Sequence, residues 1–203
     1  MTLRVTMLSA TGTDAGDELF FGDGGAGTAT EVVLPPYALA LRAPSARCAR
    51  AAEALAIAAA PESALRDLDR GSWDGRPRED VAAEDPHGFS AWLTDPGAAP
   101  HGGESVAALC RRTAAWLDSL PTDIGRVLAV TEAAVVRAAL VHGLSAPDRA
   151  FWHLGTPPPA AITLTLHDGC WTVRPGTMAI PGQRRQAADT GAAGLFAPLL
   201  VQP

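Results

Sequence analysis

The chain has no lysine and no asparagine, and all 16 of its basic residues are arginines. Without a lysine amine it cannot form a Schiff base, anchor pyridoxal phosphate or bind phosphate through a Walker-type lysine. Long apolar runs are absent too, since nowhere do about 18 unbroken apolar residues occur, so we expect no membrane span. Residues 1–8 lack the charged lead, apolar run and cleavage site of a signal peptide.

Cysteine and charge are also scarce. The three cysteines, Cys48, Cys110 and Cys170, share no C-x-x-C spacing, which favours reduced thiols and a cytoplasmic protein. Charged residues make up only 19% and the net charge is −6, which argues against nucleic acid as a partner. A length of 203 residues with 47% hydrophobic residues suits one α/β domain with a sizeable core.

Short apolar runs alternate with amphipathic segments along the sequence. Runs that predict buried strands lie at 3–8, 38–43 and 127–131, and a hairpin is predicted at 161–173. Segments that predict helices are 45–59 with Ser45 as N-cap, 79–92 as one or two short helices, 104–120 and 133–144. This order is typical of a mostly parallel sheet covered on both faces, so the predicted fold class is a three-layer α/β/α sandwich.

Five segments carry the sequence features that point to a function. They read L-R-V-T-M-L-S-A-T-G-T (3–13), A-P-S-A-R-C-A-R-A-A-E-A-L (43–55), L-R-D-L-D-R-G-S-W-D-G (65–75), P-H-G-G-E-S (100–105) and V-L-A-V-T-E-A-A-V-V-R-A (127–138). In this order they resemble the landmark motifs of the histidine phosphatase superfamily, which includes cofactor-dependent phosphoglycerate mutase and α-ribazole phosphatase. The resemblance implies a phosphoglycerate mutase-like domain over residues 1–174. It leaves 175–203 as a C-terminal extension, expected to pack on the domain or on a partner subunit.

The resemblance also implies a phosphate pocket. In the family, a histidine of the first motif is the nucleophile and becomes phosphorylated, and the arginine beside it helps to hold the phosphate. Carried over to this chain, the nucleophile position is Ala10 and the arginine position is Ser9, followed by Thr11. A methyl group has no lone pair, so phosphohistidine chemistry is excluded at Ala10. Ser9 and Thr11 carry hydroxyls, but neither has a neighbouring base in the predicted loop.

The remaining pocket positions differ from the family as well. Arg47 matches the phosphate-binding arginine of the second landmark, Glu132 stands at the late histidine, and Asp67 stands at the glutamate that acts as general acid. Counting Arg47 against the two carboxylates gives a pocket charge near about −1, which disfavours a phosphate dianion. We therefore expect Arg47 to pair with Glu132 or Asp67. We also expect the protein to be inactive in phosphoryl transfer and retained for binding a small-molecule or protein ligand.

Two other functions stay open on the sequence. A divergent hydrolase could use Asp67 and Glu132 as paired acid and base. A purely structural subunit could associate through the apolar run 195–201, for example as a homodimer. Purely structural roles also stay open for three residues. Arg47 could brace its helix, Glu132 could be a solvated acid at a helix N-terminus, and Arg137 could be a structural brace.

Two further expectations concern cofactors and the sheet surface. The five histidines show no metal-ligand spacing, so no metal is predicted, and no cofactor is implied.

The family has an amphipathic helix between its first two strands, whereas here only 24–37 is available, with Pro35 and Pro36 inside it. We expect that helix to be missing or reduced, which would leave a sheet face under-covered; the run 195–201 could fill that gap or cover a neighbour's.

Overall fold

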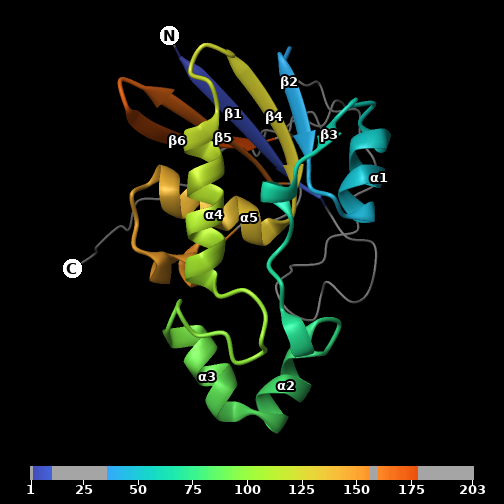
Figure 1. The fold of residues 1–203 in the computed structure, drawn as a ribbon, viewed down its shortest axis with the longest axis vertical. Coiled ribbons are helices and arrows are strands. Elements are labelled where there is room, and N and C mark those ends of the chain that lie inside the picture. Colours follow the sequence, from blue (N-terminus) through green and yellow to red (C-terminus); the bar gives the residue numbers. More distant parts are fainter. Residues whose placement is uncertain (1, 11–35, 156–159, 178–203) are drawn as a thin grey trace, which may run out of the picture.

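The computed structural model describes residues 2–10, 36–155 and 160–177, which form one six-stranded sheet with helices packed against it (Figure 1). The strand order is β3-β2-β4-β1-β5-β6. The strands are β1 (Leu3–Ser9), β2 (Leu39–Arg42), β3 (Ala60–Pro61), β4 (Arg126–Thr131), β5 (Ala160–His167) and β6 (Cys170–Thr177). The segments 24–37 and 195–201, on which two expectations rest, lie wholly or mostly outside the described residues.

Five α-helices and three short 3-10 helices connect these strands in the described part of the chain. The α-helices are α1 (Ala46–Ala54), α2 (Arg78–Glu84), α3 (Pro86–Thr94), α4 (Val106–Ser119) and α5 (Ala133–Gly143). The 3-10 helices are η1 (Ser63–Leu65), η2 (Gly71–Trp73) and η3 (Asp148–His153). None of the described helices is long and apolar enough to cross a bilayer.

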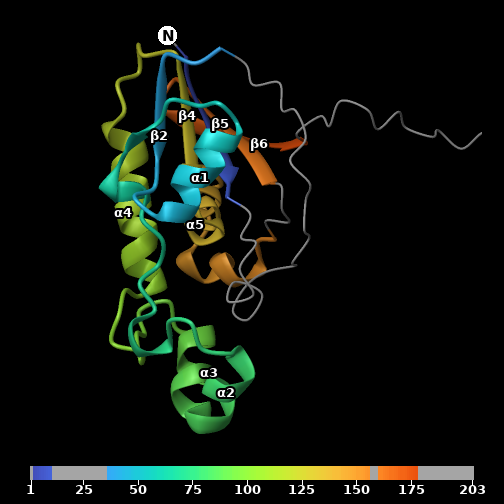
Figure 2. The ribbon, with the colours of Figure 1, turned by 90° about the vertical axis from the view of Figure 1, so that its right-hand side faces the viewer.

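The sheet is mixed, with parallel pairing at its centre. Strand β4 pairs in parallel with β1 and β2, and β2 with β3, whereas β5 and β6 add an antiparallel edge. Residues 127–131 of β4 are all buried, which a strand achieves only when both of its faces are covered. Helices α1 and α4 lie on different sides of this central part (Figure 2). The predicted fold class is therefore confirmed.

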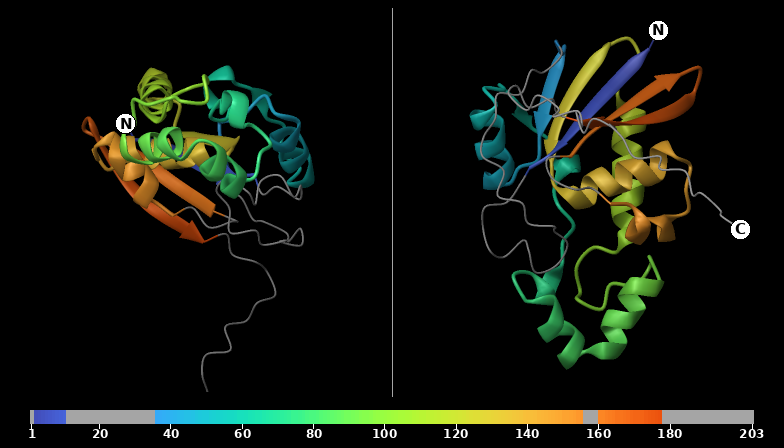
Figure 3. Two further views of the ribbon diagram at one scale, coloured as in Figure 1. Left: turned by 90° about the horizontal axis from the view of Figure 1, so that it is seen from below. Right: turned by 180° about the vertical axis from the view of Figure 1, so that it is seen from behind.

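Strands β1 and β5 present one apolar and one polar face. On one face Val5 of β1 pairs with Leu164 of β5, and both are fully buried. On the other, Arg4 is exposed, and the half-buried Thr6 and Thr163 approach each other at 3.4 Å between their hydroxyl oxygens. Among the described helices none covers this polar face of β1 and β5, which is seen from behind in Figure 3.

Local chemistry explains most of the element boundaries. Ser45 and Ser105 cap α1 and α4 by accepting hydrogen bonds from the amides of Cys48 and Ala108. The β5–β6 hairpin turns at Asp168 and Gly169 with φ values of 49° and 77°, as a two-residue turn with both residues left-handed requires.

Three boundaries differ from the sequence expectation. Helix α1 ends at Ala54 rather than near residue 59, because Ala56 adopts φ 53° and the Ile57 amide bonds back to the Ala52 carbonyl. The two-residue strand β3 follows and was not predicted. Strand β6 runs to Thr177, beyond the end of the hairpin expected at residue 173.

Candidate functional site

The carboxylate of Glu132 lies at the end of β4, where the chain turns into α5, and the residue is only 4% exposed. Three side chains of the β2–α1 segment donate to it. Ser45 Oγ lies 2.8 Å and Cys48 Sγ 3.3 Å from Oε1, and Arg47 Nη1 lies 3.0 Å from Oε2. The ion pair expected between Arg47 and a pocket carboxylate is thus present, with Glu132 as the partner.

The topology brings these residues together. Strands β2 and β4 are parallel neighbours, so the turns that follow them open at the same edge of the sheet. The first turn of α1 follows β2 and carries Ser45, Arg47 and Cys48, whereas α5 follows β4 with Glu132 at its N-cap position. Adjacent strand ends therefore place an arginine and a carboxylate side by side.

Burial controls the protonation of this cluster. It raises the pKa of Glu132, and the nearby Asp67 carboxylate raises it further, whereas Arg47, Ser45 and Cys48 oppose the shift. Burial, followed by the Glu132 charge, also raises the pKa of the Cys48 thiol to about 12. Cys48 therefore remains a protonated donor and is not a nucleophilic thiolate.

Asp67 has its own cationic partner, Arg70, with Nη1 at 3.3 Å from Oδ2. The other Asp67 oxygen, Oδ1, is buried and has no hydrogen-bond partner among the described residues. Arg47 and Arg70 face Glu132 and Asp67, so two basic side chains stand against two acidic ones. The expected pocket charge near −1 was therefore wrong, because the count from the sequence left out Arg70.

A clamp from α4 fixes the segment that carries Asp67. Arg112 Nη2 and Nε lie 2.7 and 3.0 Å from the two carboxylate oxygens of Glu104, a bidentate pair of the strong kind. The same guanidinium donates to the carbonyls of Ala64 at 2.6 Å and Arg66 at 3.1 Å. The Glu104 of the P-H-G-G-E-S motif thus holds the arginine that positions the backbone before Asp67.

The first motif reaches the same edge of the sheet. Ser9 ends β1 opposite Thr131 of β4, and the Ala10 amide donates to the Thr131 carbonyl at 2.8 Å. Thr131 Oγ1 in turn donates to the Leu65 carbonyl at 2.8 Å. Ala10 is 8% exposed, and its amide, engaged with Thr131, does not offer a free donor to an anion. Thr11 lies outside the described residues.

The other candidates have structural surroundings. The Arg137 guanidinium lies over the Phe151 ring at 5.9 Å, as a brace would. His101 is 3% exposed and accepts from the Gly103 amide, and burial lowers its pKa, so its ring is neutral. The described residues contain no group of three or more histidine, cysteine and acidic side chains able to hold a metal.

Sequence analysis missed three residues of the cluster. Ser45 was predicted only as a helix cap and Cys48 only as a reduced thiol, yet both donate to Glu132. Arg70 was not singled out, although it lies in the 65–75 segment, three residues after Asp67. A basic residue at that spacing from an acid is the signal that could have revealed it.

Residues 34–175 match the family model described as histidine phosphatase superfamily (branch 1). The chain belongs to this superfamily. Over 111 residues it is 27% identical to the adenosylcobalamin/alpha-ribazole phosphatase of Salmonella typhimurium, which covers 53% of this chain and 50% of that protein. The chain thus spans about half the length of the curated relatives it matches.

Solved structures of this superfamily's fold extend the likeness over most of the chain. The alpha-ribazole phosphatase of Shigella flexneri superposes with a TM-score of 0.72 at 18% identity, covering 89% of this chain and 100% of that chain. A histidine-to-alanine variant of the phosphoserine phosphatase of Entamoeba histolytica, in complex with phosphoserine, gives 0.68 at 13% identity, covering 84% and 94%. At these identities the comparison supports the fold.

Proposed function

We propose that this superfamily member does not transfer phosphate and that its altered pocket binds a ligand or protein partner instead. The observation that carries the proposal is the contact of Arg47 with Glu132 at 3.0 Å. By the family resemblance, Arg47 is the one retained phosphate-binding arginine, and Glu132 stands where the late histidine would be. The carboxylate therefore takes the cation that a phosphate would need.

Electrostatics argues in the same direction. A phosphate dianion entering the pocket would have to displace Glu132 from Arg47 while remaining within a few ångströms of that carboxylate. Two like charges so close repel by several kcal/mol at an effective dielectric of about 20. The paired charges of Arg70 and Asp67 leave no surplus positive charge to offset this repulsion.

Loss of a histidine need not abolish ligand binding in this fold. The Entamoeba histolytica structure contains phosphoserine although a histidine has been replaced by alanine in that protein. For this chain, Ala10 removes the nucleophile, and Glu132 changes the charge of what can bind. Binding without turnover is the function that both changes support.

Turnover assays with p-nitrophenyl phosphate and α-ribazole 5′-phosphate test the proposal, with the Salmonella typhimurium relative as positive control. We expect the unmodified chain to release phosphate no faster than buffer does. Restoring the family residues in a Ser9→Arg/Ala10→His/Glu132→His variant should produce measurable turnover, because it supplies a nucleophile and frees Arg47.

An Ala10→His variant is the matched control. It restores the nucleophile but keeps Glu132 on Arg47, so we expect little or no turnover. Thermal unfolding checks that each variant is folded, and native mass spectrometry of the unmodified protein reports any ligand that co-purifies. Turnover by the unmodified chain at a rate approaching that of the positive control would overturn the proposal.

A divergent hydrolase remains the second candidate, and one observation favours it. Burial raises the pKa of Glu132, with Asp67 nearby as a second carboxyl group, and acid–base catalysis uses two carboxyl groups that differ in pKa. Assays with non-phosphate esters distinguish it. Hydrolysis that disappears in both Asp67→Asn and Glu132→Gln would support this candidate, and hydrolysis indifferent to either change would eliminate it.

A further inference from the structure

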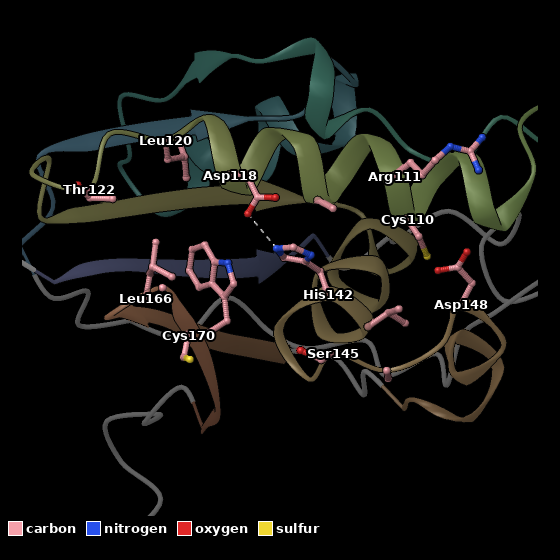
Figure 4. A pocket seen from close by; sticks show the side chains of 15 residues that line it. Cys110, Arg111, Asp118, Leu120, Thr122, His142, Ser145, Asp148, Leu166 and Cys170 are labelled. Atoms are coloured by element: carbon pink, nitrogen blue, oxygen red, sulfur yellow. Dashed lines mark hydrogen bonds and ion pairs between the residues drawn. The ribbon is translucent and has the colours of Figure 1, made fainter.

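A groove of about 710 Å³ lies away from the Glu132 cluster, between α4, α5 and the β5–β6 hairpin (Figure 4). Its walls include Leu120, Val141, Leu166 and Trp171, together with polar side chains from both helices. Across it, Asp118 of α4 meets His142 of α5, with Oδ1 and Nε2 3.1 Å apart. The groove therefore combines apolar walls with an aspartate–histidine pair.

Helix α5 separates this groove from the proposed pocket. Glu132 is at its N-terminal end and His142 is in its last turn, which for ten residues at 1.5 Å each is about 15 Å. A molecule in the groove would not touch the Arg47–Glu132 pair. Occupancy of the groove is thus independent of the proposed function.

The rim of the groove exposes apolar side chains that a covering segment would bury. Leu144 is 53% exposed and lies between the groove residues His142 and Ser145. Trp171 and Leu166 are only half-buried. A segment covering the groove would remove these apolar surfaces from water, which is favourable.

We propose that residues 195–201 of the same chain, L-F-A-P-L-L-V, occupy this groove. Strand β6 leads from the groove to this run: Cys170 and Trp171 line the groove, and the strand ends at Thr177. A segment that starts at the end of β6 must cover about 23 Å to come back to the groove, because Thr177 is seven residues beyond Cys170 at about 3.3 Å each. The intervening stretch 178–194 spans up to about 56 Å when extended, so the run reaches the groove with ample slack.

Charge complementarity favours the same occupant. The groove carries Asp118 and Asp148 against Arg111 and the His142 imidazole, which contacts Asp118, so with a neutral histidine its formal charge is −1. The stretch between β6 and the apolar run contains Arg184, Arg185 and one acid, Asp189, for a net charge of +1. The opposite signs favour this stretch beside the groove.

Disulfide trapping in the full-length chain tests this assignment, because Cys170 lines the groove and is exposed. Cys110 also lines the groove but is buried, and Cys48 is buried elsewhere. New cysteines are introduced one at a time in the run (Leu195→Cys, Phe196→Cys, Leu199→Cys and Leu200→Cys) and, as a matched control, in the preceding stretch (Ala187→Cys). Under mild oxidation, the link to Cys170 is identified by peptide mass spectrometry.

Loop closure alone gives a definite baseline for this comparison. A cysteine at position 196 is farther from Cys170 along the chain than one at 187, so without docking it should link only about half as fast. We expect instead that the fastest cysteine of the run links at least about fivefold faster than the one at 187, because docking raises its effective concentration.

Two added variants separate docking from chance collision. Leu199→Ser/Leu200→Ser in the Phe196→Cys background should lower the linking rate to about half that of Ala187→Cys, the value expected without docking, whereas Ala192→Ser/Ala193→Ser should leave it unchanged. Linking of every run cysteine at less than about fivefold the control rate overturns the proposal. So does linking only between chains, as dimers on a non-reducing gel, which would assign the groove to a second copy.

Discussion

Ser45 donates a 2.8 Å hydrogen bond to the buried carboxylate of Glu132 with the same hydroxyl that accepts the Cys48 amide at the start of α1. One side chain thereby caps a helix and satisfies an acid on a neighbouring element. The cap fixes the first turn of α1, and that turn carries Arg47 to the other carboxylate oxygen. The altered pocket is therefore built into the fold.

Ser45→Ala should cost more stability than an ordinary cap deletion. Losing the cap costs about 1 kcal/mol, and leaving a buried carboxylate short of a donor costs about 1–3 kcal/mol more. Ser105→Ala is the matched control, because Ser105 caps α4 by accepting the Ala108 amide at 3.2 Å and no described carboxylate accepts from its hydroxyl. Urea unfolding measures both variants, and equal losses would contradict the role given to the Ser45–Glu132 bond.

The stability of the protein should depend on pH through Glu132. Its folded-state pKa lies above the ordinary 4.5, with burial as the largest cause. The folded state therefore binds the proton more tightly than the unfolded chain does. This stabilising contribution is fully present below pH 4.5 and is lost as the pH rises through the raised pKa. Glu132→Gln removes it.

Urea unfolding of both proteins between pH 4 and pH 8 isolates that contribution, since the other titrating groups largely cancel in the difference. We expect the free energy of unfolding of the unmodified chain to fall relative to that of Glu132→Gln as the pH rises. A difference that stays constant, or that grows in favour of the unmodified chain, would show that burial does not control this carboxyl group.

Much of the fold could be predicted, because the apolar pattern of the strands and the capping residues of the helices indicate the same elements that the folded chain forms. The run 127–131 is apolar throughout, as a strand covered on both faces must be. Ser45 and Ser105 mark helix starts by a mechanism that is local in the sequence. The end of α1 could not be predicted, because Ala56 adopts a left-handed conformation as Ile57 turns into the core.

The candidate site, too, could be predicted only in part. The pairing of Arg47 with Glu132 followed from two landmarks whose positions the family motif fixes. The partner of Asp67 did not, because Arg70 lies outside the family's functional positions and meets Asp67 through the folding of the chain between them. Family motifs locate the functional positions. They do not locate a basic residue such as Arg70 that faces one of the acids, and the structure is needed to show that contact.

Glu132→Gln should also convert the pocket into an anion site. The substitution keeps the size of the side chain and an acceptor for Ser45 but removes one negative charge, which gives the four-group cluster a net positive charge. We expect the affinity for inorganic phosphate to rise by at least about tenfold, or ~1.4 kcal/mol. Isothermal titration measures it, and Glu132→Gln/Arg47→Ala, which removes the cation as well, should lose the gain. Unchanged affinity in Glu132→Gln would mean that Glu132 does not oppose an anion.

A pair of glycines tests how tightly the Asp67 segment is held against the P-H-G-G-E-S motif. Gly71 and Gly75 both have left-handed backbones, with φ of 47° and 70°, so alanine at either position costs about 1–2 kcal/mol in backbone conformation. Only at Gly71 would the new Cβ meet backbone atoms, the His101 carbonyl and the Gly103 amide, whereas nothing lies within 4 Å at Gly75. Gly71→Ala should therefore cost at least about 2 kcal/mol more than Gly75→Ala in urea unfolding, because backbone cannot rotate away as a side chain can. Similar costs for the two variants would show that the motif yields there, and that Asp67 and Arg70 are held by the Arg112 clamp alone.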